Sequence, residues 1–147
     1  MVSNQDMIKL YSKKILALAT EISLTEPIES PDVSITRRSP LCGSMVIISL
    51  KMRDSQISEF SQDIKACALG QAAASIIGSS IIGCCIETVE KGRDQLLSML
   101  TAEGPVPGGP FGELKVLQPA REYKNRHASI MLVLEATLEG MMSLKHK

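Results

Sequence analysis

The chain has 147 residues, 44% of them hydrophobic, so it is long enough to form one domain, spanning residues 1–147, with its own core. Its 16 basic and 16 acidic residues cancel and only 3% of its residues are aromatic, which argues against binding nucleic acid through phosphate charge or base stacking. Four cysteines are too few for a disulfide framework, and the charged N-terminal segment, with Asp6, Lys9, Lys13 and Lys14, is unlike a secretory signal. We therefore expect reduced cysteines in a cytoplasmic protein.

The first part of the chain predicts one helix followed by three strands. From Gln5 to about Thr20, apolar residues recur at three- and four-residue steps, which is typical of an amphipathic helix. Pro27 and Pro31 then break the chain into a loop. Three segments with strand-like composition follow, at Asp32 to Arg38, Met45 to Met52 and Gln56 to Ile64. Short turns between them, at residues 41–44 and 53–55, predict an antiparallel meander.

After Ala66 the pattern is helical to the end of the chain. Helices are expected at Cys67 to Ser80, from Glu87 or Arg93 to Leu100, at Phe111 to Gln118 with an end at Pro119, and at Arg126 to Met142. Glycine and proline dominate residues 103–110, which predicts a loop. The fold class expected is therefore α+β: a small three-stranded antiparallel sheet with about five helices packed on it.

One uncharged stretch, Ala66 to Ile86, is long enough to span a bilayer. It consists mainly of small residues and contains Gln71, however, and it lacks the density of large apolar side chains that favours insertion. A buried helix is the better interpretation, and we expect no membrane association.

Two cysteines lie where this meander would bring them together. Cys42 is in the predicted turn between the first two strands, and Cys67 follows the third strand at the start of an Ala-rich helix. In a meander, the first turn and the end of the third strand lie at the same edge of the sheet. Unpaired N–H groups at a helix start favour a thiolate at Cys67, and Gly43 leaves the backbone beside Cys42 free to approach a ligand closely. Converging thiolates suit a soft metal or a cluster.

The two motifs also carry a resemblance to a known family. Ser-Pro-Leu-Cys-Gly-Ser at residues 39–44, followed by a Val/Ile strand, and Ala-Cys-Ala-Leu-Gly-Gln at residues 66–71, resemble the NifU N-terminal, IscU and SufU group of iron–sulfur cluster assembly scaffolds. The order of elements agrees over nearly the whole chain. The resemblance implies the NifU/IscU-like fold and a bacterial, cytoplasmic scaffold protein.

The resemblance also implies a ligand set, and this chain departs from it. In the family, three cysteines, with an Asp in the turn or a His beside the third cysteine, hold a nascent iron–sulfur cluster or zinc. Cys42 and Cys67 match the first two cysteines, Ser44 stands at the Asp, and either Ala128 or Ser129 stands at the third cysteine. His127 matches the family histidine and is the candidate third metal ligand. The third thiol is absent under both alignments.

The function implied is that of a scaffold that binds iron or a labile cluster, with zinc as the alternative metal. Sulfur would come from a cysteine desulfurase, and the cluster would pass to apo-protein clients. Cys42, Cys67 and Gly43 would form the cluster-binding site. The sequence leaves open whether a homo-oligomer forms in which a second subunit supplies the missing ligand.

Other interpretations remain open from the sequence. The chain could be a degenerate homologue that acts as a metal-free protein-interaction module, with its cysteines as small buried side chains. Burial is the expectation for Cys84 and Cys85, which match no family ligand. A thiol-dependent transferase using Cys42 or Cys67 with His127 is a third option. No phosphate-binding or dinucleotide-binding glycine motif occurs, so we expect no enzyme activity.

Overall fold

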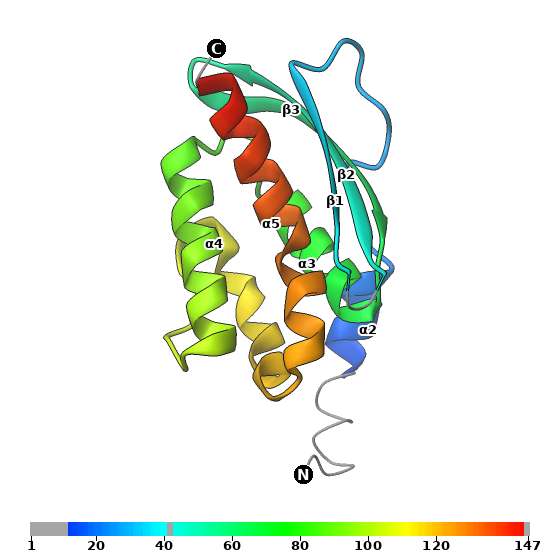
Figure 1. Ribbon diagram of the computed structural model, residues 1–147, viewed down its shortest axis with the longest axis vertical. Helices are drawn as coiled ribbons and strands as arrows, with labels where there is room; N and C mark the ends of the chain where they lie inside the picture. Colours follow the sequence, from blue (N-terminus) through cyan, green and yellow to red (C-terminus); the bar gives the residue numbers. More distant parts are fainter. Residues whose placement is uncertain (1–11, 41–42, 146–147) are drawn as a thin grey trace.

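The structure, a computed structural model, describes residues 12–40 and 43–145. The helices that follow the strands in the chain lie on one side of a three-stranded antiparallel sheet (Figure 1), which confirms the predicted α+β class. The elements in chain order are α2 (Lys13–Ala19), β1 (Val33–Arg38), β2 (Met45–Arg53), β3 (Gln56–Lys65), α3 (Ala68–Gly78), α4 (Ile86–Thr101), the 3₁₀ helix η1 (Gly109–Glu122) and α5 (Lys124–Lys145).

The strands form the predicted meander, with β2 in the centre of the sheet. Along β2 the side chains alternate, and Val46, Ile48 and Leu50 are buried against the helices. The turn between β2 and β3 consists of Asp54 and Ser55, both with positive φ (53° and 64°), which is the geometry of a tight two-residue hairpin. Short polar side chains tolerate this backbone well.

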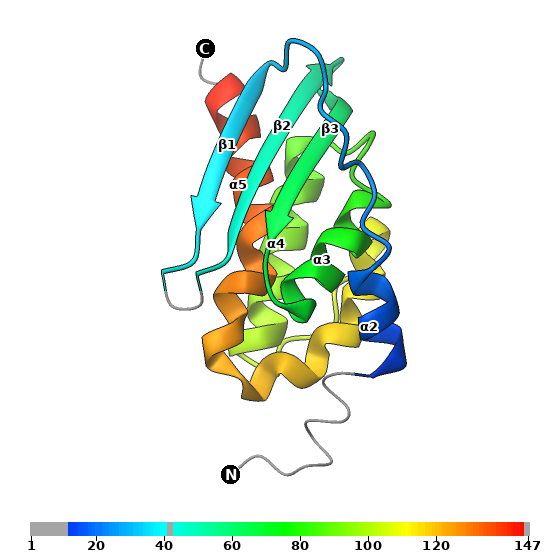
Figure 2. The same ribbon diagram turned by 90° about the vertical axis from the view of Figure 1, so that its right-hand side faces the viewer.

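The segment between α2 and β1 covers the outer edge of β3 (Figure 2). The backbone N–H of Gln62 donates to the carbonyl oxygen of Leu24 at 2.8 Å. The side-chain amide of Gln62 donates to the carbonyl oxygens of Ser23 and Ala74, at 3.0 and 3.1 Å, and so ties this segment to α3. An edge strand protected in this way does not offer its backbone to other chains.

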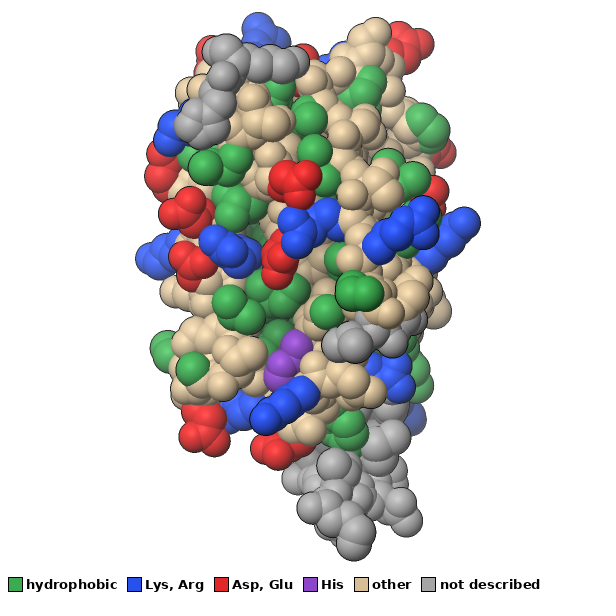
Figure 3. All heavy atoms as spheres, in the orientation of Figure 1, with side chains coloured by type: hydrophobic (Ala, Val, Ile, Leu, Met, Phe, Trp, Pro, Cys, Tyr) green, Lys and Arg blue, Asp and Glu red, His purple; other side chains and the backbone are tan. Residues whose placement is uncertain are grey.

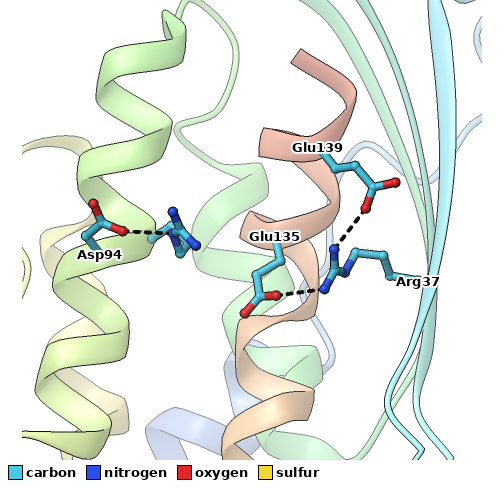
Figure 4. A network of polar contacts seen from close by, with 5 residues as sticks. Arg37, Asp94, Glu135 and Glu139 are labelled. Atoms are coloured by element: carbon cyan, nitrogen blue, oxygen red, sulfur yellow. Dashed lines mark hydrogen bonds and ion pairs between the residues drawn. The ribbon is translucent and has the colours of Figure 1, made fainter. Parts of the chain in front are cut away.

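Helix α5 runs through the middle of the molecule, between the sheet and α4 (Figure 1). It is buried on several sides because it packs against β1, β2, α3, α4 and η1 at once. Arg37 on β1 ties the strand to this helix, since its guanidinium binds Glu135 at 2.9 Å and Glu139 at 2.8 Å (Figure 4). The two carboxylates are four residues apart and therefore share one face of α5.

Two helix boundaries differ from the sequence prediction. Helix α4 begins at Ile86, immediately before the earlier of the two predicted starts. The predicted helix end at Pro119 is wrong, because η1 continues to Glu122. Its buried residues recur every three positions, the period of a 3₁₀ helix, and hold the segment against the core while Pro119 faces solvent. These buried residues are Phe111, Leu114, Leu117 and Ala120.

The remaining predictions agree with the structure within a few residues. The described part of the predicted first helix is α2, which Ser12 caps by accepting a hydrogen bond from the backbone N–H of Ile15; the earlier residues of that prediction lie outside the described residues. The uncharged stretch that begins at Ala66 forms α3 and the turn that follows it. Among the described residues, no helix combines the length and the apolar character needed to cross a membrane.

Charges of both signs alternate over the face formed by α4, α5 and the edge of the sheet (Figure 3). Acidic and basic side chains lie close to one another there, with hydrophobic side chains between them. On this face the two signs are interspersed, with no patch of a single sign visible.

Candidate functional site

The register of the sheet brings three chain segments to one edge. Arg38, at the end of β1, pairs with Met45 at the start of β2, and Met45 pairs in turn with Lys65 at the end of β3. The turn between β1 and β2 and the start of α3 therefore lie at the same edge, where α5 also begins (Figure 2). This is the edge at which the sequence predicts the two family-like cysteines.

Backbone hydrogen bonds close the base of the turn between β1 and β2. The N–H of Ser39 donates to the carbonyl oxygen of Ser44 at 2.8 Å, and the N–H of Gly43 donates to that of Ser39 at 3.0 Å. Gly43 has a φ of +71°, a left-handed conformation that glycine adopts without strain. Cys42, the first predicted ligand, lies outside the described residues, and its role stays a prediction, as does that of Gly43.

Cys67 is the residue that precedes the first turn of α3. Its backbone is extended (φ −69°, ψ 170°) and its carbonyl oxygen accepts the N–H of Gln71 at 2.9 Å, so it forms the N-cap of the helix. The side chain is partly exposed, and its sulfur lies 3.5 Å from the hydroxyl oxygen of Ser129 on α5. The second predicted ligand thus lies next to the helix on which the third would be expected.

Ser129 is the point at which the three segments meet. Its side chain is fully buried (0% exposed), and its hydroxyl oxygen lies 3.1 Å from that of Ser44, which is 3% exposed. With the contact to Cys67, one hydroxyl links the β1–β2 turn, α3 and α5. Of the two residues that the sequence leaves open for the third cysteine, Ser129 is the one placed between Ser44 and Cys67; Ala128 has no such contact among the described residues.

A glycine allows α3 and α5 to approach each other at this point. A Cβ atom on Gly70 would collide with the hydroxyl oxygen of Ser129 and would lie 2.8 Å from the Cβ of Ala66. Sequence reasoning did not assign a role to Gly70. Its signal was the run of small residues that opens α3, which is typical of closely packed helices.

His127 lies on another side of α5. Two residues along an α-helix correspond to a rotation of about 200°, so His127 and Ser129 face nearly opposite directions. The Nε2 atom of His127 is 2.9 Å from the carbonyl oxygen of Ala120 in η1, and the ring is largely buried. The described contacts do not bring His127 to Ser44, Ser129 and Cys67, and as a metal ligand it stays a prediction.

The other two cysteines lie near the far end of β3. The N–H of Ile57, close to the start of β3, donates to the carbonyl oxygen of Cys84 at 2.9 Å. Cys84 is buried as predicted, and burial together with the neighbouring Cys85 raises the pKa of its thiol. The predicted burial of Cys85 is wrong: this residue, the N-cap of α4, is partly exposed.

A hydroxyl and a carboxylate accompany Cys85 at the start of α4. Its sulfur lies 3.3 Å from the hydroxyl oxygen of Thr88. The pKa of Glu87 is lowered by a hydrogen bond from its own backbone N–H and by one from Cys85. Thr88 and Glu87, the two residues that interact with Cys85, both belong to the first turn of α4.

The donor atoms at the site edge are chemically mixed. They comprise the thiol of Cys67 and the hydroxyls of Ser44 and Ser129, beside the turn that contains Cys42. Within residues 12–40 and 43–145, no group of three or more His, Cys, Asp or Glu side chains is arranged to hold a metal ion. Thiolates suit iron, zinc and iron–sulfur clusters, whereas neutral hydroxyls are weaker donors.

Comparison with solved structures places this fold in a family. The chain is similar to a nitrogen-fixing NifU-like protein (N-terminal) from Brucella abortus, with 37% identity and a TM-score of 0.94 over 97% of this chain and 99% of that one. It is also similar in fold to FiSufU from Fervidobacterium islandicum AW-1, a candidate iron–sulfur cluster assembly scaffold protein for the SUF system, with 16% identity and a TM-score of 0.82 over 91% and 98% of the two chains. No protein-family model and no curated protein matches the chain.

The identity to the Brucella protein over nearly the full length of both chains exceeds what fold similarity alone requires. The chain therefore belongs to the family of NifU-like N-terminal proteins, as the two cysteine motifs predict.

Proposed function

We propose that this protein is a scaffold in iron–sulfur cluster assembly. It binds iron or a labile cluster as cargo through the thiolates of Cys42 and Cys67 and passes it to apo-proteins. It is not an enzyme, and it works in the bacterial cytoplasm with a cysteine desulfurase as its sulfur donor. Zinc is the alternative metal for the same thiolates.

The observation that carries this proposal is the meeting of three chain segments at Ser129. The hydroxyl of Ser129 on α5 lies 3.5 Å from the thiol of Cys67 at the N-cap of α3 and 3.1 Å from the hydroxyl of Ser44, next to the turn that contains Cys42. A binding site needs its side chains held by rigid elements, and these three come from two helix starts and a turn of the sheet. The family relationship supports a role in iron–sulfur cluster assembly.

A second candidate function is a metal-free interaction module. It is favoured by the hydrogen bond between Ser44 and Ser129, because these two buried hydroxyls satisfy one another without a metal. This module would keep the fold and the partner surface of the family and would bind no cargo.

Anaerobic reconstitution with iron and sulfide separates the two functions. For the scaffold we expect visible absorption from a bound cluster, or bound iron by elemental analysis, in the wild type. The signal should be lost in Cys42→Ala and in Cys67→Ala. It should persist in Cys85→Ala, a matched control that also removes a partly exposed N-cap thiol. Absence of bound iron and of a cluster signal in the wild type would leave the interaction module.

A further inference from the structure

We propose that the free edge of β1 is a self-association surface, at which two copies of the chain pair their β1 strands in antiparallel orientation across a two-fold axis. The two three-stranded sheets then join edge to edge into one continuous sheet. The proposal goes beyond the proposed function and does not depend on it, because it concerns the backbone of an edge strand and not the cysteines.

The two edge strands of the sheet differ in how the rest of the chain covers them. The outer edge of β3 is covered, since the N–H of Gln62 donates to the carbonyl oxygen of Leu24. β1 pairs with β2 alone, and no hydrogen bond among the described residues joins its other side to a further segment. Figure 2 shows no strand or described loop beside it there. An uncovered edge strand is a template for pairing with another chain.

The register of the sheet indicates which backbone groups of β1 face outward. The N–H of Ser39 donates to the carbonyl oxygen of Ser44, which the register of β1 and β2 places opposite it. In an antiparallel pair, such hydrogen-bonded residues alternate with residues whose backbone groups point away from the neighbouring strand. Counted back from Ser39, the residues of the second kind are Ser34, Thr36 and Arg38. Their N–H and C=O groups form the edge that a second strand would meet.

The sequence of β1 is self-complementary in antiparallel pairing. A two-fold axis near the middle of the strand passes by Thr36 or by Ile35. With the axis at Thr36, Arg38 lies opposite Ser34 of the second copy. With the axis at Ile35, Arg38 lies opposite Asp32 of the second copy. Like charges directly opposite each other destabilise a strand pair, and in neither register do two arginines face one another.

The other arginine of β1 does not protect the edge. Charged side chains often blunt an exposed edge strand, but the guanidinium of Arg37 is held by Glu135 and Glu139 on α5 (Figure 4). Met142, three residues beyond Glu139 on the same side of α5, is 37% exposed. Charges of both signs are interspersed over this face (Figure 3), so it lacks the single-sign field that would repel a second copy.

The helix layer leaves room for this pairing. Helix α5 packs against both β1 and β2, so its axis lies beneath the space between the two strands. When two copies join at β1, their α5 helices are two strand spacings apart, about 10 Å. Packed helices ordinarily lie about 8–10 Å apart. The two α5 helices would therefore pack against each other beneath the joined strands.

The pairing also bears on whether a second subunit supplies the missing ligand. Antiparallel pairing places the β1–β2 turns of the two copies at opposite ends of the joined strands. In the two registers, the Arg38 residues of the two copies are offset by about four or six positions along the strands, or about 14–20 Å. The turns lie beyond these residues. Each candidate site therefore stays within its own chain.

Sedimentation equilibrium of the full chain, under reducing conditions and between about 1 μM and 1 mM, tests the proposal. The wild type should change from monomer to dimer as the concentration rises. Thr36→Pro removes an outward N–H that the pairing with β2 does not use, so this variant should fold. Its dimer dissociation constant should be at least about tenfold higher than that of the wild type, a difference of about 1.4 kcal/mol.

A second variant covers the case in which proline disturbs the strand, as circular dichroism would show. Thr36→Lys keeps every backbone group and brings the added charges of the two copies close to the two-fold axis, so it should weaken the dimer at least about threefold. Thr101→Lys, the same substitution at an exposed position at the end of α4, is the matched control and should dimerise like the wild type.

Two results overturn the proposal. One is a wild type that stays monomeric at every concentration, even if an extended segment of another protein binds at β1. The other is a dimer that neither substitution of Thr36 weakens, since such a dimer would form through another surface.

Discussion

Two cysteines of this protein have similar local backbone structure but different tertiary contacts. Cys67 and Cys85 both form N-caps with extended backbone, both are partly exposed, and both place their sulfur beside a hydroxyl. The hydroxyl beside Cys67 belongs to Ser129, 62 residues away on a different helix. The hydroxyl beside Cys85 belongs to Thr88, three residues along the same helix.

This difference distinguishes the candidate site at Cys67 from the local helix start at Cys85. At Cys85 the partners come from one turn of α4 and would form in any helix with this sequence. At Cys67 the partners come from α5 and the β1–β2 turn, and they meet only when the sheet and helices have packed. Local sequence can create the first arrangement, whereas the second depends on the whole fold.

Substitution of Gly70 should disturb the site region most. In Gly70→Ala the new Cβ collides with Ser129, so we expect a net loss of roughly 1–2 kcal/mol in the free energy of unfolding, since overpacking outweighs the better helix propensity of alanine. Urea denaturation measures this loss. In the double variant Gly70→Ala/Ser129→Ala, part of the loss should be recovered; simple additivity would contradict the close contact.

Removal of each hydroxyl compares the two regions directly. Ser129→Ala should cost about 1 kcal/mol, because a buried hydroxyl shared by two other chain segments is lost. Thr88→Ala should change stability by less than about 0.5 kcal/mol, since its contact is local and partly exposed. Thermal and urea unfolding of both variants test this ranking. Equal losses in the free energy of unfolding would mean that the two hydroxyls contribute equally to stability.

Thiol reactivity should separate the neighbouring cysteines near the start of α4. The thiolate is the reactive form, and burial and the adjacent Cys85 raise the pKa of Cys84. Alkylation of the folded protein, followed by mass spectrometry, should therefore modify Cys84 more slowly than Cys85 or Cys67. After denaturation the three rates should become similar. Equally fast modification of Cys84 in the folded state would show that its burial does not protect it.

The smallest effect expected is a pH dependence at Glu87. Its pKa is lowered below the ordinary value of 4.5, so the ionised carboxylate stabilises the folded state above that value. The stabilisation should be lost as the pH falls through the lowered folded-state pKa. Wild type and Glu87→Gln should thus differ slightly in Tm at neutral pH and converge in strong acid. The same difference at all pH values would exclude the charge as the cause.

Much of the fold follows from periodicity in the sequence. The three strands and the tight turn at Asp54 and Ser55 follow from alternation and turn composition. The end of η1 does not, because Pro119 is a local stop signal that packing every third residue overrides. The start of α4 was left between Glu87 and Arg93, and the structure has it at Ile86.

The candidate site, like the fold, could be predicted from the sequence only in part. Two cysteine motifs predict the family, which the comparison with the Brucella protein confirms, and the edge of the sheet at which the candidate site is expected. The residue that replaces the third thiol could not be chosen, because Ala128 and Ser129 are adjacent and each fits one alignment. His127 matched the family by position, yet its ring contacts Ala120 in η1.

The sequence by itself determined the class of fold, the family and the absence of a third thiol near the start of α5, because these depend on residue type and order along the chain. Only the tertiary structure decided that Ser129 meets Ser44 and Cys67. The physical reason is geometric: one residue along an α-helix turns a side chain by about 100°, and only the packing of α5 against α3 and the sheet decides which direction faces the site.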